Sequence, residues 1–200
     1  GSGAGTPAWS PDGNTLAYYS QSAGGLVIED LNCRVSSTDC VDPSPGKPSV
    51  MGWNPTWSFD GKSIAYEALD AIHILNLDSG VSTELTLGYE FCQRPDWSPK
   101  EDKVVLGCYN GQKRIVIVVD LPLPETAIEE LDTPGNCTDP VWSPDAKHIA
   151  MICEDISGSQ PSLGFGDSAV YPNAIYVADL NGHTVVTKVS EAKDESFEWV

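Results

Sequence analysis

The stretch Pro55-Thr56-Trp57-Ser58-Phe59-Asp60-Gly61, followed by the apolar run Ile64-Ala65-Tyr66, decides the fold because it recurs along the chain. Related copies begin at Pro7, Pro95 and Pro140, and a further copy begins within residues 196–200. Each of the first four copies has a second half, an apolar strand that ends in a leucine directly preceded by Asp or Asn. These closing leucines are Leu31, Leu77, Leu121 and Leu180.

This repeat predicts an all-β protein, because the apolar positions follow strand periodicity and each unit holds four short strands. Regular repetition of such units is typical of a β-propeller. We expect four four-stranded blades at about residues 4–50, 51–91, 92–136 and 137–192, with residues 193–200 as the first strand of a fifth. The ring would then be incomplete, or completed by other copies.

The six cysteines show a pattern in register with the repeat. Cys92 and Cys108, like Cys137 and Cys153, lie five residues before and eleven residues after the tryptophan of their unit. A hairpin turn between them sets these positions opposite each other, within reach of a disulfide. Cys33 and Cys40 fall in one loop and form the third expected bridge. Buried free thiols are the alternative.

The repeat Pro-x-Trp-Ser-Pro-Asp-Gly, then Ile-Ala, then Ile-Tyr-Val-x-Asp-Leu, resembles the PD40 (WD40-like) β-propeller repeat of the TolB family. The resemblance covers essentially the whole chain. It implies an extracytoplasmic binding scaffold and carries no catalytic residue onto this sequence. Two copies depart from the pattern: Lys100-Glu101-Asp102 replaces Asp-Gly in the third, and Ala146 replaces glycine in the fourth.

The overall charge excludes some classes of partner. With 11 basic and 29 acidic residues the chain carries −18, so it offers no basic footprint for nucleic acid or for an anionic membrane surface. Its longest strongly apolar run, Ile115 to Val119, is too short to span a bilayer, and we expect no membrane insertion. Disulfides indicate an oxidising compartment: the periplasm, the cell surface or the extracellular space.

The sequence offers little catalytic or metal-binding chemistry. It contains no Gly-x-Ser-x-Gly elbow and no Asp-x-Asp-x-Asp-Gly calcium loop. We expect no catalytic residue, no cofactor and no resident metal. Asp42, Asp155 and Asp167 could contribute to a looser calcium site, and solvated loop carboxylates are the preferred interpretation.

Protein interaction is therefore the leading functional prediction, with a propeller portion of a peptidase or a polysaccharide-processing enzyme as the alternative. That enzyme's catalytic residues would lie outside this chain. The fourth unit carries an insert, roughly Glu154 to Asn173, on which a protein partner could dock. The terminal strand could instead pair with another copy, giving a homo-oligomer or a strand-donating assembly. The candidate contact residues are Leu163, Phe165, Tyr171, Phe197 and Trp199.

Overall fold

The computed structural model describes residues 4–31, 50–122, 127–154, 162–163, 169–170, 173–180 and 185–191. Within these ranges the regular secondary structure is entirely β. No helix long and apolar enough to cross a bilayer occurs in the ranges searched. Several residues predicted to bind or to pair lie outside the described residues: Cys33, Cys40, Asp42, Asp155, Phe165, Asp167, Tyr171, Phe197 and Trp199.

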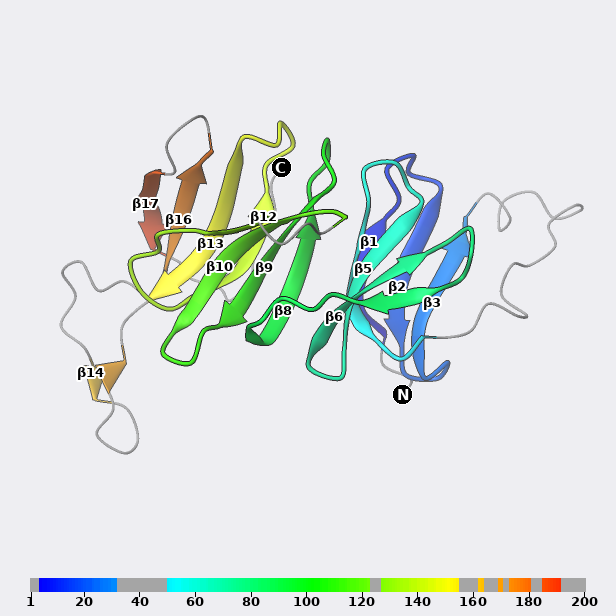
Figure 1. The fold of residues 1–200 in the computed structure, drawn as a ribbon, viewed down its shortest axis with the longest axis horizontal. Coiled ribbons are helices and arrows are strands. Elements are labelled where there is room, and N and C mark those ends of the chain that lie inside the picture. Colours follow the sequence, from blue (N-terminus) through cyan, green and yellow to red (C-terminus); the bar gives the residue numbers. More distant parts are fainter. Residues whose placement is uncertain are drawn as a thin grey trace, which may run out of the picture. The chain divides into compact units, whose positions relative to one another are not determined.

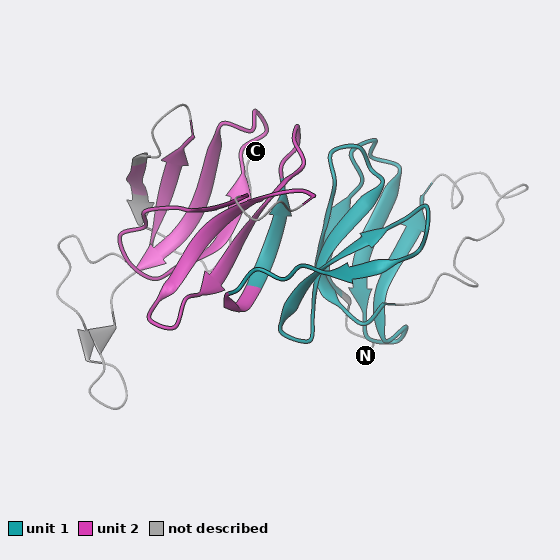
Figure 2. Cartoon of the chain, viewed as in Figure 1, with its two compact units in different colours: residues 1–88, 93–97 teal, residues 89–92, 98–200 magenta. Residues whose placement is uncertain are grey.

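The chain divides into two compact units, which are coloured separately in Figure 2. Unit 1 comprises residues 1–88 and 93–97, and unit 2 comprises residues 89–92 and 98–200. Each is described here by itself. The limits of the individual blades stay a prediction.

Unit 1 contains two antiparallel sheets (Figure 1). The first has the order β1-β2-β3, built from β1 (Ala4–Trp9), β2 (Thr15–Ser20) and β3 (Gly25–Asp30). The second has the order β4-β5-β6-β7, built from β4 (Trp53–Trp57), β5 (Ser63–Ala68), β6 (Ala71–Asn76) and β7 (Ser82–Glu84). In both sheets, strands adjacent in sequence are adjacent in space, as in a propeller blade.

The strands of unit 2 follow the same order. One sheet runs β11-β10-β9-β8, from β8 (Glu90–Trp97, shared between the units), β9 (Lys103–Tyr109), β10 (Arg114–Asp120) and β11 (Ile128–Glu130). The other runs β12-β13-β16-β17, from β12 (Cys137–Trp142), β13 (His148–Glu154), β16 (Asn173–Asp179) and β17 (Val185–Glu191). Between β13 and β16 the short strands β14 (Ser162–Leu163) and β15 (Ala169–Val170) pair with each other. Leu163 is thus placed in a strand, but its side chain is outside the described part.

The second strand is buried on both faces in the second, third and fourth blades (β5, β9 and β13), whereas β2 of the first blade is largely half-buried. In β5, Ile64 and Ala65 are fully buried and Tyr66 is nearly so. Ile64 and Tyr66 join Trp57 and residues of the first sheet, including Ala17, in one apolar cluster. A blade covered on both faces needs a strand without a polar face, which explains the apolar run after each Asp-Gly turn.

An apolar ring at the same position of every repeat is expected to be buried between blades, and it is buried in three of the four copies. Trp57, Trp97 and Trp142 are 8%, 6% and 6% exposed. The indole nitrogen of Trp57 donates a hydrogen bond to the Ala8 carbonyl of the preceding sheet (3.0 Å). Trp9, by contrast, is 58% exposed. The expectation is wrong for this copy, because burial of the ring depends on the neighbouring blade and not on the repeat that carries it.

The two hairpin disulfides are present as predicted. Cys92 is bonded to Cys108 and Cys137 to Cys153, with Cα atoms 4.0 and 4.1 Å apart. The register of β12 and β13 pairs Cys137 directly with Cys153. The corresponding residues of the first blade, Ala4 and Ser20, are also direct partners. A common register therefore explains why both cysteine pairs have the same spacing.

Candidate functional site

A bulge recurs in the first strand of the blades. The residue three places before the repeat tryptophan has a left-handed backbone in all four copies, with φ between 49° and 54°: Thr6, Asn54, Arg94 and Asp139. The strand register shifts at this point in β1, β4 and β12. Non-glycine residues pay for this conformation, and such strain is concentrated at functional positions. Bulges also re-aim neighbouring side chains.

Around the bulge of β4, polar contacts join three successive first strands of unit 1. The Asn54 backbone N–H donates to Thr6 Oγ1 (3.1 Å). The Asn54 side-chain nitrogen donates to Glu67 Oε1 (2.6 Å), and the Arg94 backbone N–H donates to the same oxygen (2.5 Å). Arg94 Nη1 also donates to Asn54 Oδ1 (3.4 Å). The buried Glu67 carboxylate therefore fixes the bulged strands on either side of it.

Glu67 also fixes an exposed indole. Trp53 lies directly opposite Glu67 in the register of β4 and β5, and its indole nitrogen donates to Glu67 Oε2 (2.7 Å). Trp53 nevertheless remains 41% exposed, whereas Glu67 is 9% exposed. The ring is thus held in one orientation while part of its surface faces solvent. Because the Trp53 side chain is already ordered, binding of a partner to it would cost little conformational entropy.

Two more apolar side chains lie at the same end of this hairpin. Met51 precedes β4 and is 69% exposed, and Leu69 follows β5 and is 82% exposed. Leu69 and Asp70 form a two-residue turn in which both have positive φ, 51° and 64°. Asn and Gly are the usual residues of such a turn. A leucine there has a strained backbone and also exposes an apolar side chain to water. We call Met51, Trp53 and Leu69 the Trp53 patch.

The composition of this region fits recognition of a protein. Tryptophan and arginine are enriched among the residues that dominate binding energy, and Arg94 is exposed beside the patch. Carboxylate, amide and indole groups around Glu67 satisfy one another, so the cluster presents no evident nucleophile or base. Among the described residues, no group of three or more His, Cys, Asp or Glu side chains is placed to hold a metal ion.

The Trp53 patch was missed in the sequence, although the signal was available. Trp53 and Glu67 lie four residues before and ten residues after Trp57. The hairpin register that pairs the cysteines also pairs these two positions. The predicted contacts of Leu163, Phe165, Tyr171, Phe197 and Trp199 stay predictions, because none of these side chains is described.

Comparisons with known proteins agree with this architecture. Over 164 residues the chain is 27% identical to the Tol-Pal system protein TolB of Francisella tularensis, in subspecies mediasiatica and tularensis. The match covers 78% of this chain and 37% of the subspecies mediasiatica protein. The chain therefore spans well under half of these curated relatives. No protein-family model matches it.

Solved structures show the same fold. TolB of Acinetobacter baumannii superposes with a TM-score of 0.70 at 18% identity, over 95% of this chain and 44% of that protein. The chain therefore has the β-propeller blade fold of the TolB structures. A protein assigned as TolB from Agrobacterium tumefaciens gives a TM-score of 0.54 at 19% identity, over 98% of this chain and 85% of that one. The dihydro-heme d1 dehydrogenase NirN gives 0.56 at 16% identity, over 93% of this chain and 36% of NirN, a likeness of fold alone.

Proposed function

We propose that this TolB-like chain is a non-catalytic protein-interaction module of an oxidising, extracytoplasmic compartment, the periplasm being the preferred location. The single observation that carries the proposal is the Trp53 patch, an exposed indole oriented by a buried carboxylate beside an exposed leucine in a left-handed turn. Exposed apolar groups held on a rigid scaffold are typical of protein-binding surfaces. The two disulfides support the location.

The relatives suggest where to seek the partner. They are named as Tol-Pal system proteins, so a Pal protein from the same organism is the first partner to test. The experiment immobilises the chain and measures the binding of soluble Pal by biolayer interferometry. Trp53→Ala and Leu69→Asn should each weaken binding by about 30-fold or more if they are central contacts.

Val81 provides a matched control, because it is also a large apolar residue of unit 1 and is 58% exposed. Val81→Ala should leave the affinity unchanged. Equal loss in all three variants would mean that general surface hydrophobicity causes the binding. Undetectable binding of Pal at about millimolar concentration would count against Pal, and unchanged affinity of Trp53→Ala would count against the patch.

Self-association is a second candidate, favoured by the exposure of Trp9. In the second blade the equivalent ring, Trp57, is 8% exposed and packs on the preceding sheet. The face of the first blade that carries Trp9 therefore matches a surface that this protein uses to pack one blade on another. A second copy is the proposed occupant. Sedimentation velocity should show mass above one chain that Trp9→Ala abolishes, and monomeric wild-type protein would refute it.

A further inference from the structure

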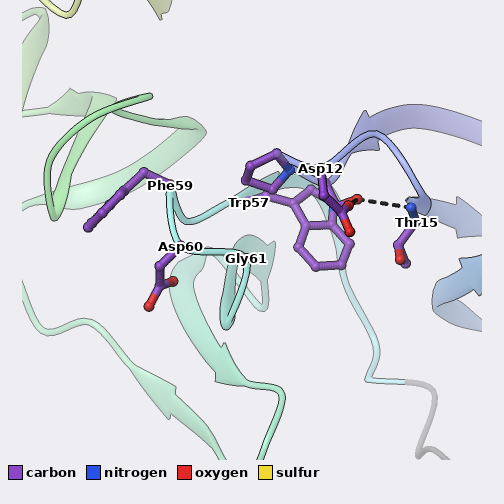
Figure 3. A pocket seen from close by; sticks show the side chains of 8 residues that line it. Asp12, Thr15, Trp57, Phe59, Asp60 and Gly61 are labelled. Carbon is purple, nitrogen blue, oxygen red and sulfur yellow. Dashed lines mark hydrogen bonds between the residues drawn. The ribbon is translucent and has the colours of Figure 1, made fainter.

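The repeated turns of the first two blades border a half-open cavity of about 440 Å³ in unit 1, at the opposite end of the strands from the Trp53 patch. One turn supplies Ser10, Pro11 and Asp12, and the other supplies Phe59, Asp60 and Gly61. The two turns are close neighbours, since a Cβ built on Gly61 would lie 3.8 Å from Pro11 Cδ. Trp57 lies between them in Figure 3 and lines the cavity.

Each turn holds its carboxylate in a fixed place. Asp12 Oδ1 accepts hydrogen bonds from Ser10 Oγ (2.5 Å) and the Asn14 backbone N–H (3.1 Å). Asp60 Oδ1 accepts from Ser58 Oγ (2.7 Å) and the Lys62 backbone N–H (3.0 Å). The second oxygen of Asp60 lies 3.9 Å from Lys62 Nζ, and that lysine side chain is 67% exposed.

These contacts keep both carboxylates ionised. The Ser10 hydroxyl, followed by the Asn14 groups, lowers the pKa of Asp12 below the ordinary value of 3.8. The Lys62 backbone N–H, followed by the Ser58 hydroxyl, lowers the pKa of Asp60 in the same way. At neutral pH the cavity therefore carries two negative charges.

The apolar lining narrows the class of ligand. The Trp57 indole nitrogen donates to the Ala8 carbonyl (3.0 Å) and the residue is 8% exposed, so this indole gives the cavity a small apolar surface and no donor, whereas Phe59 is 39% exposed. A bare metal ion would gain little from the side chains of Trp57, Phe59 and Pro11. A guanidinium or alkylammonium group is stabilised by both the carboxylates and the apolar lining. Its charge is attracted to the carboxylates, and its cation and alkyl stem can pack against the aromatic rings.

We infer that this cavity is a binding site for a basic side chain, arginine in preference to lysine, presented by a partner protein. The inference rests on the proposed function as a protein-binding module and adds a second contact point to it. A planar guanidinium can pair with a carboxylate and stack on an aromatic ring at the same time, which an ammonium does less well. The net charge of −18 would assist the approach of a basic partner.

The test is an NMR titration of the ¹⁵N-labelled chain with Nα-acetyl-arginine amide. The expected result is a saturable shift of the Trp57 indole and Gly61 amide signals. Nα-acetyl-citrulline amide, a neutral isostere, should leave them in place. Asp12→Asn with Asp60→Asn keeps the turn acceptors but removes both charges, and should weaken binding at least tenfold.

Asp145 supplies the matched control. It occupies the same kind of turn in unit 2, with Ser143 Oγ at 2.6 Å and the Lys147 N–H at 3.1 Å, but it does not line this cavity. Asp145→Asn should leave the titration unchanged. If it weakens binding as much as the double variant does, the attraction is general acidity and the inference fails. Equal shifts with the citrulline compound would also overturn it.

Two further arms identify the source of the ligand. The peptide acetyl-Gly-Gly-Arg-Gly-Gly-amide should bind at least as well as the single amino acid. If putrescine instead binds tighter than this peptide, free amines and not a protein side chain are the ligand. Because no arm uses Pal, failure of the arginine titration would leave the proposed function standing, and failure of Pal binding would leave this inference standing.

Discussion

Removal of the Cys137–Cys153 disulfide should lower the free energy of unfolding of unit 2 by about 3 kcal/mol. The two cysteines are 16 residues apart in sequence, and closing a loop of that length removes about this much entropy from the unfolded chain. Alanine is the right replacement, because both cysteines are fully buried and a serine hydroxyl would add the cost of an unpaired polar group.

The turn of the same hairpin is strained and provides a compensating change. Ala146 has φ of 60°, where the first two blades place Gly13 and Gly61 at 72° and 71°. The left-handed conformation of a residue with a Cβ destabilises the folded state by about 1–2 kcal/mol. Glycine removes this strain, but the greater conformational entropy of the unfolded chain lowers stability by about 0.4–1 kcal/mol. Ala146→Gly should therefore stabilise unit 2 by about 0.5–1 kcal/mol. It should do so equally with and without the disulfide, because residues so far apart along the hairpin act independently.

Urea unfolding followed by tryptophan fluorescence measures both effects, with the midpoint converted to a free energy through the denaturant slope. Cys92→Ala with Cys108→Ala is the parallel control, since that pair has the same separation of 16 and should give a similar loss. A loss below about 1 kcal/mol for either pair would refute the loop-closure reasoning. A gain from Ala146→Gly that disappears in the disulfide-free protein would show that the two features are coupled.

Three other changes test the structure. Glu67→Gln should lower stability by about 1–2 kcal/mol and increase acrylamide quenching of Trp53, because an amide cannot accept every hydrogen bond that the carboxylate accepts. Unaltered quenching would mean that Glu67 does not orient the ring. Leu69→Asn should raise the urea midpoint by relieving its left-handed backbone, and a lower midpoint would mean that Leu69 packs within the fold. The hydrogen bond to Glu101 raises the pKa of Lys103 above 10.5. The stabilisation of the fold by charged Lys103 is therefore complete below pH 10.5 and is lost as pH rises through the raised pKa. Lys103→Met should lack that alkaline loss, and an identical pH profile would contradict the assignment.

The repeat in the sequence was enough to predict the strands, their order and the two hairpin disulfides. These features follow from local periodicity and from a register that is the same in every copy. The exposure of Trp9 could not be predicted in this way, since Trp9 and Trp57 occupy the same repeat position and differ only in what lies against them. The left-handed bulge was also invisible, because its residues include Thr6 and Arg94, neither of which signals positive φ.

The left-handed bulge keeps one backbone conformation in all four blades while the residue at that position changes. Thr6, Asn54, Arg94 and Asp139 share one backbone conformation, with φ between 49° and 54°, and carry four different polar groups. The strain is held in place by neighbours, as in the hydrogen bond from the Asn54 N–H to Thr6 Oγ1. A position whose backbone is fixed by the repeat and whose side chain is free to differ is suited to binding. The strain recurs because the register of the first strand shifts at the same place in β1, β4 and β12.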